Sequence, residues 1–144
     1  MMIATSTVLP AAPEQVWALL RDFAAIGDWH PFLPSARIER GPADRVGSVR
    51  VFPAAGDHRE RLVALDDRAR RIEYAFEDTA GLPVRDYLSA MRVEPVDGGT
   101  RTFVEWSATF DCDAADADKV TGQVRDGIFN PGLAALGQRF RPEA

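Results

Sequence analysis

Glu60 is the side chain of this sequence whose position most directly suggests chemistry. In the segment 57–66 it shares one face with Leu62 and Ala64, because side chains alternate between the two faces of an extended strand. If that face turns into the concave side of a sheet, the carboxylate must be paired, hydrated or protonated, since an isolated buried charge is very costly. A paired carboxylate in a cavity is typical of a binding or acid–base site.

His30, Tyr87 and Arg50 are the other polar side chains for which a reaction can be written. His30 or Glu60 would remove a proton alpha to a carbonyl group. Tyr87 or Arg50 would then stabilise the enolate oxygen. The candidate catalytic residues are therefore His30, Glu60 and Tyr87.

The same residues also have structural interpretations, which the sequence leaves open. His30 can satisfy a loop carbonyl, and Tyr87 can pack in the core with its hydroxyl in water. Glu60 can pair with Arg50 as a structural ion pair.

The strands around Glu60 carry aromatic residues on one face. Tyr74 and Phe76 alternate with charged residues, as do Tyr87, Ser89 and Met91 further along the chain. We expect these faces to turn inward.

The face of the strand on which Glu105 lies is ambiguous from the sequence. Val104, Trp106, Ala108 and Phe110 form the more apolar face of segment 101–111, which puts Glu105 on the outer face. A cavity that is partly polar can mislead such a count. The directions of Glu105 and Trp106 therefore stay open.

Motifs for metals and cofactors are missing from the sequence. The two histidines, His30 and His58, are far apart and lack the spacing of a zinc protease. A serine hydrolase elbow, a phosphate-binding glycine loop and a dinucleotide fingerprint are also missing. We expect no metal and no cofactor.

Composition excludes other classes of function. The 22 acidic and 17 basic residues give a net charge of -5, which disfavours nucleic acid as a partner. No stretch approaches the roughly eighteen apolar residues of a membrane span, and the N-terminus lacks the pattern of a secretory leader, so we expect no membrane insertion. The lone Cys112 excludes an internal disulfide and fits a reducing compartment, which favours a cytoplasmic location. The 144 residues suit a single domain spanning 1–144, as a monomer or homodimer.

The periodicity predicts an α+β fold. A strand at 3–9 precedes an amphipathic helix that begins at Pro13, and a loop rich in proline follows at 28–34. Regular turn signals then separate six strands that connect as an antiparallel meander, and they occur at 41–42, 53–57, 66–70, 78–83 and 97–99. A long C-terminal helix, which Asp113 can cap, is expected to cover the sheet, with a bend near Asn130.

This order of elements resembles the START-like, helix-grip superfamily (SRPBCC), which includes bacterial polyketide cyclase/dehydrase-like proteins. The resemblance covers nearly the whole chain, and its stretches are 13–17, 28–32, 47–50, 60–62, 65–67 and 132–136. It implies a seven-stranded curved antiparallel sheet wrapped around a long C-terminal helix, with short helices after the first strand.

Plant abscisic-acid receptors, distant members of this superfamily, have a similar progression of Gly-Ser-Val-Arg, Glu-Arg-Leu and Leu-Asp-Asp. The resemblance implies that Glu60 lines a ligand cavity and that His30 lies where these receptors have a ligand-binding lysine. It also implies that Tyr87 and Glu105 match pocket residues, which for Glu105 opposes the periodicity. The receptors' gate loop is not matched by the turn at 52–56, so no hormone-receptor function is implied.

The main functional prediction is a carrier or sensor that binds a small lipophilic molecule between the sheet and the C-terminal helix. One alternative is a cyclase- or dehydratase-like enzyme that uses the same cavity, and a second is a protein-interaction accessory module. The residues predicted to contact the ligand are Trp29, His30, Phe32, Arg50, Phe52, Glu60, Leu62, Tyr74, Phe76, Tyr87, Ser89, Met91, Glu105, Val124 and Ile128.

Overall fold

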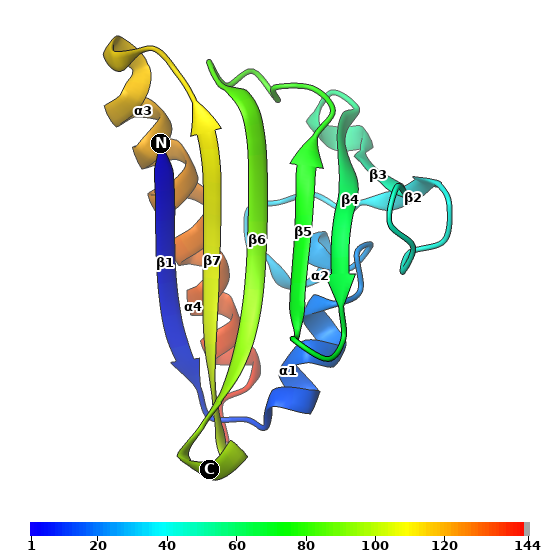
Figure 1. The fold of residues 1–144 in the computed structure, drawn as a ribbon, viewed down its shortest axis with the longest axis vertical. Coiled ribbons are helices and arrows are strands. Elements are labelled where there is room, and N and C mark those ends of the chain that lie inside the picture. Colours follow the sequence, from blue (N-terminus) through cyan, green and yellow to red (C-terminus); the bar gives the residue numbers. More distant parts are fainter. Residues whose placement is uncertain (143–144) are drawn as a thin grey trace.

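Seven antiparallel strands form one open sheet in the computed structural model, which describes residues 1–142 (Figure 1). Their order across the sheet is β1-β7-β6-β5-β4-β3-β2. The strands are β1 (Met2–Leu9), β2 (Arg37–Arg40), β3 (Val49–Phe52), β4 (His58–Asp66), β5 (Arg71–Phe76), β6 (Arg85–Val96) and β7 (Arg101–Asp111). Strands β2 to β6 each pair with the next strand in the chain, and β7 also pairs with β1, so the predicted meander is confirmed.

The helices lie together behind the sheet in Figure 1. Two short helices follow β1, namely α1 (Pro13–Leu20) and α2 (Ile26–Trp29). Helix α1 begins with a proline, whose missing N–H would have no partner in the first turn. None of the helices in the described part of the chain is long and apolar enough to cross a membrane.

The C-terminal helix consists of α3 (Ala117–Thr121), a π-helical segment (Gly122–Phe129) and α4 (Asn130–Arg139). Pro131 has no N–H to donate to the carbonyl of Gly127, which an α-helix would require. Directly before this proline, the N–H of Asn130 donates to the carbonyl of Arg125, which is the five-residue spacing of a π-helix. Pro131 therefore lies where the π-helical segment ends and the α-helix α4 begins.

Asp113 occupies the N-cap position before the first helical turn, at 114–116, but it does not cap that turn with its side chain. Its backbone is extended, as a cap requires, but its side chain makes no capping hydrogen bond. The carboxylate instead lies 3.4 Å from Arg85 on β6.

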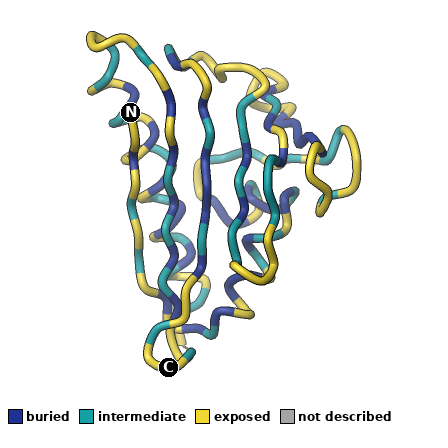
Figure 2. The backbone as a smooth tube through the Cα atoms, viewed as in Figure 1, coloured by how far each residue is buried: buried dark blue, intermediate teal, exposed yellow. Residues whose placement is uncertain are grey.

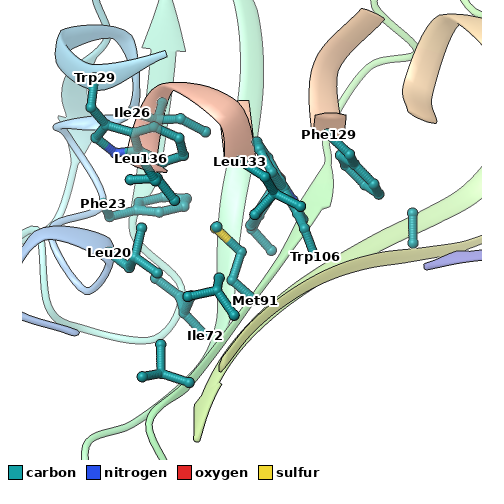
Figure 3. Packing of buried hydrophobic residues seen from close by; sticks show 14 of the residues in the cluster. Leu20, Phe23, Ile26, Trp29, Ile72, Met91, Trp106, Phe129, Leu133 and Leu136 are labelled. Atoms are coloured by element: carbon teal, nitrogen blue, oxygen red, sulfur yellow. The ribbon is translucent and has the colours of Figure 1, made fainter. Parts of the chain in front are cut away.

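The core fills the space between the sheet and the helices, and buried and exposed positions alternate along the strands (Figure 2). Figure 3 shows Leu136 of α4 beside Trp29 and Ile26 of α2, and Leu133 beside Trp106 of β7. Burial of these side chains stabilises the packing of the C-terminal helix on the sheet.

Candidate functional site

The strand register brings distant residues into rows on the inner face of the sheet. Glu60 on β4 lies opposite Arg50 on β3 and Phe76 on β5. The rings of Phe76, Tyr87 and Phe110 continue this row across β5, β6 and β7 as a stack, with centroids 3.9 Å and 5.9 Å apart. An ion pair and an aromatic stack therefore share one row.

An internal cavity of about 240 Å³ lies beside this row, between the sheet and the π-helical segment. Its lining residues are Leu33, His58, Tyr74, Phe76, Ala80, Leu82, Tyr87, Trp106, Gln123, Val124 and Ile128. Tyr74, Trp106 and Val124 are buried, whereas Ala80 and Gln123 are exposed and mark the mouth. The cavity thus has an aromatic interior and an opening between the loop after β5 and the C-terminal helix.

A second hollow, which we call the outer cleft, lies where β5 and β6 separate. Its volume is about 360 Å³, and its walls carry five charged side chains, Arg61, Glu77, Asp78, Arg85 and Asp86. Phe76 and Tyr87 line both the outer cleft and the internal cavity, and the two linings have no other residue in common. The β5–β6 pairing ends at Ala75 and Leu88, next to a bulge in β6, so this ring pair separates the two hollows.

Four alternating charges run from the core to the outer cleft. Arg50 donates to Oε1 of Glu60 from Nε at 2.9 Å and from Nη2 at 2.6 Å. His58 donates from Nε2 to Oε2 of Glu60 at 2.9 Å and from Nδ1 to Asp78. The side chains of Arg50 and Glu60 are 4% and 8% exposed, and that of Asp78 is 45% exposed. We call this set the buried charge chain, and its formal charges cancel when His58 is protonated.

The pKa shifts in the buried charge chain favour its charged forms. Burial alone would lower the pKa of His58, but hydrogen bonds and charges from Glu60 and Asp78 outweigh it, so the pKa lies above its ordinary value. Burial alone would raise the pKa of Glu60, but the charge of Arg50 and the contacts with His58 outweigh it, so this pKa is lowered. His58 is therefore held as an imidazolium between two carboxylates.

Aromatic rings surround the guanidinium of Arg50. Its Cζ lies 4.1 Å from the centroid of Phe23 and 4.6 Å from that of Tyr74. Its Nη1 donates to the carbonyl of Phe23 at 2.9 Å. Arg50 is thus fixed on all sides and serves to compensate the buried Glu60.

Three polar side chains meet at the inner end of the cavity. The indole Nε1 of Trp106 donates to the hydroxyl oxygens of Tyr74 and Ser89, both at 3.1 Å. The hydroxyl of Ser89 donates to the carbonyl of Ser107 at 2.9 Å. Burial, followed by the charge of Glu60, raises the pKa of Tyr74 to about 12, so its hydroxyl keeps its proton at neutral pH.

His30 lies outside the cavity lining and joins α2 to the C-terminal helix. Its Nδ1 accepts backbone N–H groups of Phe32 and Leu33 at 3.0 Å and 3.3 Å. Nε2 therefore carries the proton and donates to the carbonyl of Ile128 at 2.7 Å. Burial lowers the pKa of His30 and keeps it neutral. This arrangement agrees with the structural interpretation, in which His30 satisfies a carbonyl.

The structure distributes the predicted ligand-contacting residues over several environments. Five of them line the internal cavity: Tyr74, Phe76, Tyr87, Val124 and Ile128. Seven are buried behind it, in the charge chain or the core: Trp29, His30, Arg50, Phe52, Glu60, Leu62 and Met91. Ser89 is buried where it contacts Trp106 at the inner end of the cavity. Phe32 is 69% exposed.

Glu105 lies on the outer face of β7, where it pairs with Arg92 at 3.1 Å. Trp106, its neighbour in the strand, is fully buried and lines the cavity. Strand alternation therefore places Glu105 correctly, and the pocket position implied by the resemblance is wrong for this residue.

His58 is the functional candidate that the sequence analysis missed. The histidine spacing tests His58 only for metal binding, although His58 lies on the same inner face of β4 as Glu60 and Leu62. Within residues 1–142, no group of three or more potential ligands is placed to hold a metal ion. Three loop residues, Leu33, Ala80 and Leu82, and the exposed helical residue Gln123 were missed as well, because periodicity does not identify loop or exposed residues that approach a cavity.

Comparison with known proteins agrees with this architecture. A family model described as "Polyketide cyclase / dehydrase and lipid transport" matches residues 2–141. A protein from Thermobifida fusca, known from its solution NMR structure, is 33% identical with a TM-score of 0.90, over 96% of this chain and 92% of that chain. The protein XoxI from Bacillus cereus is 31% identical with a TM-score of 0.78, over 96% of this chain and 94% of that chain.

Norcoclaurine synthase from Thalictrum flavum, in complex with dopamine and hydroxybenzaldehyde, shares the fold. It is 14% identical with a TM-score of 0.75, over 100% of this chain and 89% of that chain. The match of the family model to nearly the whole chain and the similar structures lead to one conclusion: this chain belongs to the polyketide cyclase/dehydrase and lipid transport family and has the helix-grip fold of the START-like superfamily.

Proposed function

We propose that the protein binds a small, largely apolar molecule in the internal cavity, as a carrier or sensor. The observation that carries this proposal is a cavity of about 240 Å³ whose interior consists mainly of aromatic and aliphatic side chains. Pockets for drug-sized ligands usually measure about 300–1,000 Å³, so the expected occupant is smaller than a typical drug. Removal of its apolar surface from water supplies the affinity.

The hydrogen bonds of the polar residues favour binding over turnover. Glu60 accepts three hydrogen bonds, two from Arg50 and one from His58. Both ring nitrogens of His58 and both of His30 are engaged as well. A general base needs a lone pair that can reach the substrate, and none of these three side chains offers one in this arrangement.

One observation supports an acid–base enzyme as the second candidate. His58 borders the same cavity as Tyr87, and its partner Asp78 is largely exposed. If a substrate carbonyl replaced Asp78 at Nδ1, the imidazolium would become a general acid. This route needs a rearrangement that simple binding does not.

The binding proposal is tested by calorimetric titration with naphthol, a small aromatic probe, and with variants at the mouth. We expect Gln123→Trp to weaken naphthol binding at least tenfold, because an indole at this position fills the opening. Gln138→Trp is the matched control, since Gln138 is an exposed glutamine on the same C-terminal helix away from the cavity. Equal affinities of the two variants, or no binding to the unmodified protein, would contradict the proposal.

Recovery of the ligand distinguishes the two candidate functions. A carrier returns a bound carbonyl probe unchanged after prolonged incubation, as seen by mass spectrometry. A probe that incorporates deuterium alpha to its carbonyl in heavy water, and does so only with the protein present, would instead support the enzyme.

A further inference from the structure

The inner end of the cavity has more hydrogen-bond donors than acceptors. Four protons meet there, from the indole of Trp106 and the hydroxyls of Tyr74, Tyr87 and Ser89. The proton of Ser89 goes to the carbonyl of Ser107, and the indole proton is shared between Tyr74 and Ser89. The two tyrosine protons remain to be placed.

Ser89 can accept one of these two protons. A hydroxyl oxygen has two lone pairs, and Trp106 already uses one of those on Ser89. Among the described residues, Tyr74 accepts from Trp106, and Ser89 is the neighbour that both tyrosine hydroxyls approach. Ser89 has one lone pair left for two phenolic protons, so at least one phenolic O–H faces the cavity without an acceptor among residues 1–142.

The surroundings favour an oxygen over an amine at this position. Both tyrosine side chains line the cavity and are more than nine-tenths buried. Burial raises the pKa of both hydroxyls, so they remain donors at neutral pH. The charged groups that face them are Glu60 and Arg50 beside Tyr74, and the His58 imidazolium in the same cavity wall. Glu60 is compensated by its partners, and a cationic amine would meet donors and an imidazolium.

We propose that the natural occupant is an apolar molecule with an acceptor oxygen, such as a ketone, aldehyde or carboxylate, and that Tyr87 and Tyr74 select it by donating hydrogen bonds. This inference rests on the proposed binding function and specifies its ligand class. The oxygen lies at the inner end of the cavity, and the apolar body extends past Val124 toward the mouth.

The test compares two probes of the same shape in calorimetric titrations. Acetonaphthone carries a carbonyl oxygen where ethylnaphthalene has a methylene group. Tyr87→Phe removes one hydroxyl and keeps the ring that stacks on Phe76. We expect this variant to weaken acetonaphthone binding about two- to twelvefold relative to ethylnaphthalene, which is the effect of one hydrogen bond. Tyr74→Phe is measured in the same way, because either hydroxyl can be the principal donor.

The outcomes separate this inference from the proposed function. A change in the ratio of the two affinities in at least one variant supports the inference. If both probes bind and neither variant alters the ratio, the inference is overturned while the binding function stands. If neither probe binds the unmodified protein, both are overturned. A naphthylethylamine probe that binds more tightly than acetonaphthone would also overturn the choice of an acceptor oxygen.

Discussion

Arg50→Met is the substitution that most directly tests the buried charge chain. The change removes both hydrogen bonds to Oε1 of Glu60 and leaves the carbonyl of Phe23 without its donor. Because both ionic side chains are less than a tenth exposed, water cannot replace the lost partner. Loss of one member of a buried pair costs about 3–5 kcal/mol. For a domain of this size the melting temperature should fall by roughly 6–20 °C, at about 2–4 °C per kcal/mol.

Arg59→Met is the matched control for this experiment. Arg59 also forms a two-point ion pair, with Glu39 at 2.6 Å and 2.8 Å, but the two side chains are 37% and 26% exposed. Solvent screens that pair, so we expect no resolvable change in melting temperature. Scanning calorimetry at pH 7 measures both variants.

The double substitution Arg50→Met with Glu60→Leu completes the experiment. It removes both buried charges, and we expect it to recover most of the stability that Arg50→Met loses. If Arg50→Met unfolds at the same temperature as Arg59→Met, the charge chain does not compensate Glu60 as described. If the double variant is less stable than Arg50→Met alone, the uncompensated carboxylate is not the source of the loss.

Two further predictions concern pH and helix packing. The pKa of His58 is raised on folding, so its contribution is fully present below its ordinary pKa of about 6.5 and is lost as pH rises through the folded value. Urea unfolding across pH 6 to 9 should show this decline, and His58→Gln should flatten it; a parallel decline in the variant would exclude His58 as the cause. A Cβ at Gly132 would lie 2.7 Å from two aromatic rings, so Gly132→Ala should cost about 1–3 kcal/mol. Gly127→Ala meets nothing within 4 Å and should stabilise the helix or leave it unchanged, and denaturation curves that rank the two the other way would contradict the packing described.

The sequence predicts the fold because alternation and turn residues agree along most of the chain. Each turn signal between 41 and 99 falls between two strands of the structure. Pro131 predicts an interruption of the regular helix, but the π-helical segment that precedes it is defined by backbone hydrogen bonds over five residues. Periodicity does not contain that information.

The site was predicted less completely, for reasons that differ between residues. Glu60 and Arg50 could be anticipated, because a carboxylate on an inward strand face needs a partner. His58 shares that face but was considered only for metal binding. Ala80 and Gln123 reach the cavity from a loop and a helix, and their approach is set by tertiary packing. Glu105 shows the opposite case, in which strand alternation predicted the direction correctly and the family resemblance did not.

The contact between Phe76 and Tyr87 has a consequence for how firmly the sheet holds together at this end. The ladder of backbone hydrogen bonds between β5 and β6 stops at Ala75 and Leu88, and the bulge that follows lets Asp86 adopt a left-handed backbone with φ of 53°. Parting the strands beyond that point separates two rings and breaks no rung of the ladder. Separating β5 from β6 therefore costs less here than along their hydrogen-bonded part, and amide protons that flank the two rings should exchange with solvent faster than those in the middle of β6.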